Sequence, residues 1–236
     1  MIFHLISSPR NISTALMYSF YHRGDTAVVD EPFYAYYLDR ATRVHPGQDE
    51  ILAQMEKEPS RVIAGINDRA AEKSHLFIKN MAHHLVEMPL DFLVSYRNIL
   101  LIRDPKQLIA SFAQVLPNPR MEDVGIKRQH EIFQFLGSGK EVAVIDSGEL
   151  LKDPPKYLEA LCEVLNIPFS LAMHQWQPGP IPDDGVWAKF WYKNVHQSEG
   201  FMIQKTSQRE LPSECEPLYK EALPYYHELS KYALKI

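Results

Sequence analysis

Residues 3–24 constrain the fold most, because the hydrophobic pattern changes period within a few positions. Phe3 to Ile6 is a largely apolar run, which is typical of a strand buried on both faces. A short Ser-Ser-Pro-Arg-Asn turn follows, and apolar residues then recur at helical spacing until Gly24 ends the helix. Strand, tight turn and helix direct free backbone N–H groups and a helix dipole toward one point, so the turn predicts an anion site.

The side chains of this turn suit an anion. Arg10 carries a permanent charge on a fork that matches phosphate or sulfate, and Ser13 and Thr14 offer hydroxyl donors in the first helical turn. The turn is not a Walker A loop, because it contains no glycine and has Arg10 where a lysine is expected. On this segment alone, an ordinary strand-to-helix connection with Ser or Asn as the helix cap remains the alternative.

A second segment, residues 97–112, repeats the arrangement. Ile99 to Ile102 predict a buried strand, Arg103 and Asp104 follow it, and Pro105 suits the first turn of a helix. Ser111 stands eight residues after Arg103, so a strand-end guanidinium and a helix hydroxyl can bind one further phosphate. The alternative for Arg103 is a salt bridge to Asp104 or a surface charge.

Together these segments resemble the PAPS-dependent sulfotransferase superfamily, P-loop-like enzymes that transfer a sulfuryl group from 3′-phosphoadenosine 5′-phosphosulfate (PAPS). The first segment is similar to the family's 5′-phosphosulfate loop, and the second to its R-[DN]-P motif with a serine eight residues after the arginine. The chain departs from the family at Ile12, where a glycine is usual. The resemblance implies that PAPS is bound, without a metal, by Pro9, Arg10, Asn11, Ile12, Ser13, Thr14, Arg103 and Ser111.

A closer resemblance covers most of residues 2–201. The chain is similar to a bacterial sulfotransferase-like group that has a PR-x-x-STALM start, a DEPF segment, an MAHHL segment and a GVW…WY…VH stretch. This implies a sulfotransferase that moves the sulfuryl group to a hydroxyl or amine of a small-molecule acceptor. The sequence does not identify the acceptor or the oligomeric state.

The rest of the chain alternates between strand and helix patterns, which predicts an α/β fold with a parallel sheet of about five strands flanked by helices, in a P-loop NTPase-like architecture. We expect one domain over residues 1–236, with a long amphipathic helix over 121–136, a helix over 156–165 and a C-terminal helix within 212–236, from about 214 to 234. The further strands are expected at 26–29, 76–78, 99–102 and 142–145.

Candidates for the general base follow two predicted strands. The resemblance implies a base at Glu31, because carbohydrate sulfotransferases carry a similar E-P segment, or at His83 or His84, because cytosolic sulfotransferases place a histidine after the third strand. Histidine titrates near neutrality, whereas a glutamate must be desolvated to be an effective base. Structural roles are the alternatives: Glu31 pairs with Arg10 or Lys79, or a histidine caps a neighbouring helix. Arg10 is the expected stabiliser of the leaving phosphate.

Residues 168–201 are expected to form a loop or lid over the crevice. Aromatic residues in its second half can stack on adenine or line the acceptor pocket, and basic residues there can meet phosphate; the alternative is that the aromatics pack on the core. Lys79 can be an anion contact or a surface charge, of which we expect the surface charge, and Asp30 is expected to be a structural acceptor rather than a base. The aromatic and basic residues concerned are Trp187, Lys189, Trp191, Tyr192, Lys193, His196 and Phe201.

Composition excludes several classes of partner. The net charge is −5, so a strongly basic nucleic-acid-binding surface is not expected and any anion site must be local. The two cysteines are too few for a disulfide framework, and no apolar run approaches the ~20 residues of a membrane span. We therefore expect a cytoplasmic protein with no membrane partner. No cluster of histidine, cysteine and carboxylate residues has metal-binding spacing.

Two other functions stay open at this point. One is a phosphotransferase or nucleotide hydrolase on the same scaffold, for which Asp146, after the fifth predicted strand, is the nearest carboxylate for magnesium. The other is a non-catalytic nucleotide-binding module that kept the fold without the chemistry.

Overall fold

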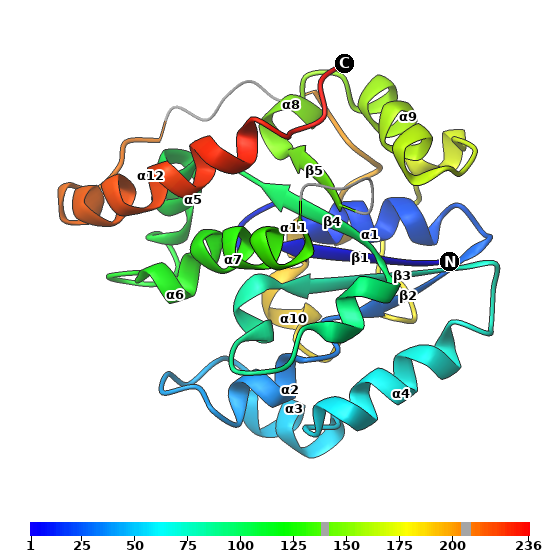
Figure 1. The fold of residues 1–236 in the computed structure, drawn as a ribbon, viewed down its shortest axis with the longest axis horizontal. Coiled ribbons are helices and arrows are strands. Elements are labelled where there is room, and N and C mark those ends of the chain that lie inside the picture. The colour runs from blue at the N-terminus through cyan, green and yellow to red at the C-terminus, as the bar shows by residue number, and fades with distance from the viewer. Residues whose placement is uncertain (138–141, 204–208) are drawn as a thin grey trace.

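The computed structural model describes residues 1–137, 142–203 and 209–236, which form a parallel sheet covered by helices on both faces (Figure 1). The sheet has the strand order β2-β3-β1-β4-β5, and every neighbouring pair is parallel. The predicted fold class is confirmed, and each predicted strand lies within an observed one. The strands are β1 (Ile2–Ser7), β2 (Thr26–Asp30), β3 (His75–Met81), β4 (Arg97–Ile102) and β5 (Val142–Asp146).

Helices cover both faces because successive residues of a buried strand point to opposite sides. Leu5 of β1 belongs to a core shared with helices α1 and α9, and Ile6 belongs to a second core shared with α4, α5, α7 and α12. None of the helices in the described residues is both long and apolar enough to cross a lipid bilayer. The helices are α1 (Ser13–Tyr21), α2 (Tyr34–Leu38), α3 (Gln48–Gln54), α4 (Pro59–Arg69), α5 (Pro105–Phe112), α6 (Met121–Val124), α7 (Ile126–Leu136), α8 (Ser147–Leu150), α9 (Pro154–Leu165), α10 (Ala188–Trp191), α11 (Lys193–His196) and α12 (Glu216–Ser230), with short 3-10 turns at Ala82–Leu85, Asp91–Ser95, Leu171–Met173 and Ser213–Cys215.

The prediction of one long helix over 121–136 is wrong. Gly125 has a φ of 72°, a left-handed conformation that ends α6 and turns the chain into α7. A Cβ atom at this position would lie 3.4 Å from the Cβ of Ala82, so the corner also packs closely on the chain that follows β3. The C-terminal helix is shorter than predicted, because the chain leaves α12 at Ser230 and Ala233 bridges to Val144 of β5.

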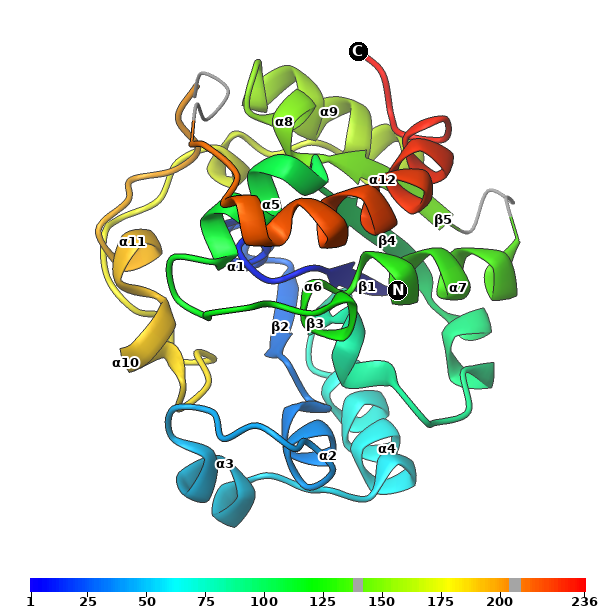
Figure 2. The ribbon, with the colours of Figure 1, turned by 90° about the vertical axis from the view of Figure 1, so that its left-hand side faces the viewer.

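The carboxyl ends of all five strands lie at one edge of the sheet, toward the left of Figure 1. Figure 2 faces this edge, with α10 and α11 on its left, α2 and α3 below it, and α5 above it. Ligands of open parallel sheets bind outside these strand ends. The fold therefore places the predicted site residues that follow β1, β2, β3 and β4 along a single edge.

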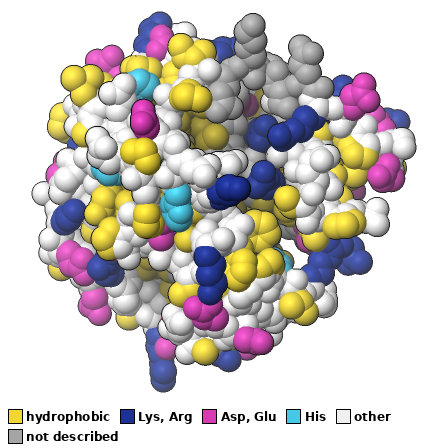
Figure 3. Space-filling view, turned by 180° about the vertical axis from the view of Figure 1, so that it is seen from behind, with side chains coloured by type: hydrophobic (Ala, Val, Ile, Leu, Met, Phe, Trp, Pro, Cys, Tyr) yellow, Lys and Arg dark blue, Asp and Glu magenta, His cyan; other side chains and the backbone are white. Residues whose placement is uncertain are grey.

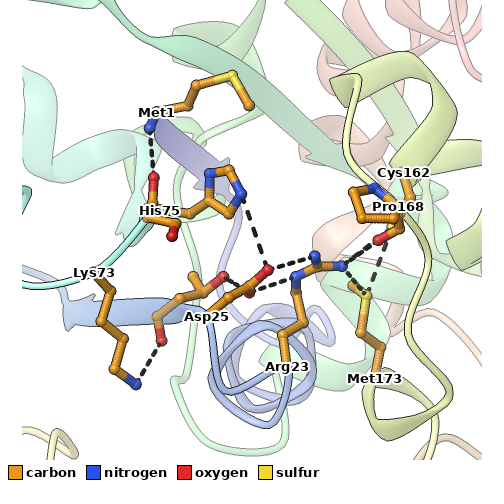
Figure 4. A network of polar contacts seen from close by, with 10 residues as sticks. Met1, Arg23, Asp25, Lys73, His75, Cys162, Pro168 and Met173 are labelled. Atoms are coloured by element: carbon orange, nitrogen blue, oxygen red, sulfur yellow. Dashed lines mark hydrogen bonds and ion pairs between the residues drawn. The ribbon is translucent and has the colours of Figure 1, made fainter.

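The opposite edge carries a structural network of polar contacts (Figure 4). Arg23, whose side chain is buried, donates to both carboxylate oxygens of Asp25 at 3.0 Å and to the carbonyl oxygen of Pro168 at 2.8 Å. Asp25 directly precedes β2, and Pro168 follows α9. The guanidinium group thus joins the end of α1 to the loop after α9, at the amino ends of the strands and away from the predicted site.

Candidate active site

The loop after β1 is held in its shape by side chains and needs no glycine at Ile12. Ile12 has a φ of −77°, an ordinary value, whereas Arg10 has a φ of 56° in the left-handed region. The carbonyl of Arg10 accepts a hydrogen bond from the Arg103 guanidinium, and the amide of Asn11 donates to the carbonyl of Leu101 at 3.0 Å. A left-handed conformation costs a non-glycine residue on the order of 1–2 kcal/mol, which these contacts offset.

A cavity of about 230 Å³ opens above this loop and brings the predicted 5′-phosphosulfate loop together with the candidate bases. The Nε atom of Arg10 is buried and has no hydrogen-bond partner among the described residues, so it is available to an anion. The side chain of Ile12 does not line the cavity and packs against the core instead. The predicted residues that do line it are Pro9, Arg10, Asn11, Ser13, Thr14, Glu31, His83 and His84, together with Lys79.

Arg103 and Ser111 lie beside the cavity and do not line it. The buried hydroxyl of Ser111 accepts a hydrogen bond from Arg209 Nη1 at 3.2 Å, and Arg103 contacts the backbone of Arg10. Burial, and then the charge of Arg209, lowers the pKa of both Arg10 and Arg103. Sequence spacing did not indicate Arg209, which lies 98 positions from Ser111.

Three guanidinium groups are therefore close enough to repel one another, although the protein as a whole is acidic. Such a group of like charges is stabilised by a polyanionic ligand. Viewed from behind, Lys and Arg side chains also gather in the middle of the molecular face (Figure 3). The expectation that any anion site must be local agrees with this arrangement.

Lys79 is fully buried, so its expected position at the surface is wrong. Its ammonium group donates to Asp30 Oδ1 at 2.8 Å and to Glu31 Oε1 at 2.5 Å, and it also contacts the hydroxyl of Tyr192. That hydroxyl donates to Asp30 Oδ2 at 2.7 Å. Burial without such partners would neutralise the amine, whereas two carboxylates keep the pKa of Lys79 above its usual value.

Glu31 follows β2 with a φ of 44° and lines the cavity, although its side chain is almost completely buried. Burial raises the pKa of Glu31 to about 7; the charge of Asp30 adds to the rise, and Lys79 opposes it. A carboxylate with this pKa can accept a proton near neutral pH. Of the structural alternatives, pairing with Lys79 is present and pairing with Arg10 is not among the described ion pairs.

The two histidines are buried and neutral. Burial, with the charge of His45 adding to the effect, lowers the pKa of His83 to about 3, and burial lowers the pKa of His84 well below its usual value. The ring of His84 stacks between Tyr34 and Tyr37, with ring centroids 4.6 and 5.1 Å away, and its Nδ1 lies 3.7 Å from Glu31 Oε2. Neutral imidazoles in this setting are weak bases.

The late segment forms one side of the cavity. Trp187, Trp191 and Tyr192 line it, and the first and last of these are also part of the core. Phe201 does not line the cavity and packs on Trp176 with ring centroids 5.5 Å apart. Two of the basic residues that could meet phosphate do not line the cavity and are paired with carboxylates, Lys189 with Glu50 at 2.5 Å and His196 with Asp184 at 2.9 Å. Lys193 is exposed and does not line the cavity.

Asp146, the candidate magnesium ligand of the hydrolase alternative, serves as a helix cap. One carboxylate oxygen accepts from the backbone of Gly148 at 2.7 Å, and the other from the hydroxyl of Tyr226 at 2.9 Å. Asp146 does not line the cavity. Within the part of the chain that the structure describes, no three residues of the types His, Cys, Asp and Glu gather as metal ligands.

Comparison with solved structures supports the fold. A sulfotransferase domain from the curacin biosynthetic pathway superposes with a TM-score of 0.55 at 18% identity, over 99% of this chain and 98% of that chain. A sulfotransferase domain from the Synechococcus PCC 7002 olefin synthase gives a TM-score of 0.54 at 18% identity, over 93% of each chain.

Comparison of sequences identifies the family. Branched-chain-amino-acid aminotransferase-like proteins 1 and 2 of Arabidopsis thaliana are 38% and 35% identical to the chain over 230 residues, which is 97% of this chain but 41% of each relative. The chain thus spans about two fifths of the length of these curated relatives. A family model described as a sulfotransferase domain matches residues 1–233. The chain therefore belongs to the sulfotransferase domain family.

Proposed function

We propose that this sulfotransferase uses PAPS as its donor and transfers the sulfuryl group to a hydroxyl or amine of a small acceptor bound in the cavity. One observation carries the proposal: Arg10, with a buried nitrogen that lacks a partner among the described residues, and Glu31, with a raised pKa, line the same cavity. A cation for the donor and a base for the acceptor thus face a common space.

Two groups of residues can bind the two phosphate-bearing ends of the donor. Backbone N–H groups at the start of α1, with Ser13 and Thr14, would hold the 5′-phosphosulfate. Arg103 and Ser111 would bind the 3′-phosphate, and Arg209 joins this set because it contacts the Ser111 hydroxyl. The mutual repulsion of the arginines supports a ligand that carries more than one phosphate.

The chemistry requires only that charges be placed correctly. PAPS supplies the sulfuryl group when it is bound. Glu31 accepts the proton of the acceptor as the acceptor oxygen or nitrogen bonds to sulfur, and the bond between sulfur and the bridging oxygen of the donor breaks. Arg10 stabilises the negative charge that develops on that oxygen, which leaves with adenosine 3′,5′-bisphosphate (PAP). His83 and His84 contribute neutral hydrogen-bonding nitrogens, and their low pKa values favour Glu31 as the base.

The acceptor end of the cavity favours a molecule without an anionic group. Its cations are already paired: Lys79 with two carboxylates, and Arg43 with Asp123 at 3.3 Å. Aromatic side chains supply much of the remaining wall. We therefore expect the neutral 4-methylbenzyl alcohol to be a better acceptor than the similarly shaped 4-(hydroxymethyl)benzoate. We also propose that residues 168–201 act as a lid over the cavity.

Calorimetric titration with PAP tests the donor assignment. PAP is expected to bind more tightly than AMP, because only PAP carries the 3′-phosphate. Turnover of PAPS with a panel of alcohols, phenols and amines then tests catalysis. Binding of PAP without turnover of any acceptor would support the non-catalytic alternative, and magnesium-dependent hydrolysis of ATP would support the hydrolase alternative.

A further inference from the structure

Gln129 of α7 lies beneath the loop of Arg10 with every part of its amide engaged. The side chain is fully buried, and its nitrogen donates to the carbonyls of Ile6 and Leu101, both at 2.9 Å. Its oxygen accepts from the hydroxyl of Ser8 at 3.0 Å. One side chain therefore joins the carboxyl ends of β1 and β4 to the first residues of the loop.

The loop is attached on both sides of Arg10. Ser8 contacts Gln129 on one side, and Asn11 donates to the carbonyl of Leu101 on the other. That carbonyl is the same one that accepts from Gln129, so the two attachments meet at one atom. Arg10 itself is in the left-handed region, which a non-glycine residue keeps only where its surroundings hold it there.

The beginning of α7 packs closely against its surroundings, which fixes the position of Gln129. A Cβ atom at Gly125 would lie 3.8 Å from the Ser8 hydroxyl oxygen and 3.9 Å from the backbone nitrogen of His83. The turn into α7 therefore packs against both the anion loop and the chain that carries the histidines. Gln129, one helical turn later, acts from an element that already contacts both sides of the site.

We propose that Gln129 is a positioning residue that sets the place of Arg10 and of the backbone N–H groups that receive the 5′-phosphate of the donor. The loop contains no glycine, and the hydrogen bonds of this buried amide hold the turn against the sheet. The inference rests on the proposed use of PAPS, since it assigns Gln129 to the 5′-phosphate end of that ligand.

The experiment compares three nucleotides by calorimetry: PAP, 5′-AMP and 3′-AMP. Gln129→Met keeps the approximate volume of the side chain but removes its amide. Ser8→Ala removes only the hydrogen bond between the loop and Gln129. Asn98→Leu is the matched control, because Asn98 is a buried amide that donates to the carbonyls of Leu93 and Tyr96, at 2.8 and 3.0 Å, near the start of β4. Thermal unfolding is measured for every variant.

Gln129→Met and Ser8→Ala are each expected to weaken the binding of PAP and 5′-AMP by about tenfold, the scale of one charge-assisted hydrogen bond. The affinity for 3′-AMP should stay unchanged. Asn98→Leu should lower the melting temperature without changing any of the three affinities. Should Gln129→Met fail to fold, Ser8→Ala decides the question alone. Equal losses for 5′-AMP and 3′-AMP, or unchanged affinities in Ser8→Ala, overturn the positioning role. If the wild-type protein binds none of the nucleotides, the proposed use of PAPS is wrong and the inference fails with it.

Discussion

The ammonium group of Lys79 lies 2.5 Å from Glu31 Oε1 and 2.8 Å from Asp30 Oδ1, so two buried carboxylates share one buried cation. The three ionised groups would together carry one negative charge. Because the site is buried, that excess charge is relieved most easily when one carboxylate binds a proton. Glu31 is the carboxylate that faces the cavity, and its pKa of about 7 makes it the group that exchanges a proton with a ligand there.

Glu31→Gln is expected to lower kcat/KM for sulfuryl transfer by about 10²–10⁴. In the proposed reaction the unprotonated carboxylate is the active form, so the wild-type rate should rise with pH through about 7, and the variant should lose this limb of the profile. His83→Asn and His84→Asn are the controls, and each should keep the limb. A profile that loses its limb in a histidine variant and keeps it in Glu31→Gln would assign the base to that histidine.

Arg10→Ala should lower kcat more than it lowers the affinity for the donor. In the proposed reaction its guanidinium stabilises the charge that develops on the bridging oxygen, so its largest contribution is expected in the transition state. The measurement is a comparison of kcat with the calorimetric Kd for PAP in the same variant. A rise in KM with an unchanged kcat would make Arg10 a ground-state binding group only.

Arg103→Ala and Arg209→Ala should weaken the binding of PAP far more than that of AMP. Both arginines are tied to the proposed 3′-phosphate end, Arg103 by its motif and Arg209 by its 3.2 Å contact to Ser111. The lost interaction is expected to cost roughly 1.5–3 kcal/mol for PAP. Ser111→Ala provides a third variant with no change of charge. Equal losses for the two nucleotides would argue against a 3′-phosphate site here.

The sheet and the loop were predictable because fully buried parallel strands appear as continuous apolar runs, and because all carboxyl ends of such strands meet at one edge. The burial of Lys79 was not, since a lysine after an apolar run looks like any surface lysine. Only the register, which pairs Asp30 of β2 with Lys79 of β3, brings its carboxylate partner beside it. The place of Arg209 beside Ser111 could not be predicted either, because the two residues are far apart in the sequence and no local pattern indicates their contact.

Gln129 did leave a signal in the sequence. It lies three residues after Ile126 and four before Phe133, in the buried stripe of the helix pattern, where an apolar residue is usual. A polar residue at such a position needs partners, and here those partners are the strand ends and the loop. Gly125, an isolated glycine within the helical pattern of residues 121–136, marked the break in the same way.

The stability of the protein should fall as the pH falls below about 6.5. Burial lowers the pKa of His4 to about 3, although its hydrogen bond to Asn98 acts in the opposite direction. Burial, together with the charge of His45, also lowers the pKa of His83 to about 3. In the unfolded chain both have a pKa of about 6.5, so below that pH the unfolded state binds protons that the folded state does not. Between pH 7.5 and pH 5.5 each such histidine should cost on the order of 1 kcal/mol of the free energy of unfolding.

His4→Gln isolates one of these contributions. His4 is fully buried in β1, contacts the Asn80 amide at 2.8 Å and does not line the cavity, so the change leaves the proposed chemistry untouched. Urea unfolding at the two pH values should show that the variant loses less free energy of unfolding than the wild type, by on the order of 1 kcal/mol. Glu31 acts in the opposite sense, since its raised pKa lets the folded state bind the extra proton, but it is common to both proteins and cancels in the comparison. Identical losses in the variant and the wild type would show that the pKa of His4 is not lowered in the folded protein.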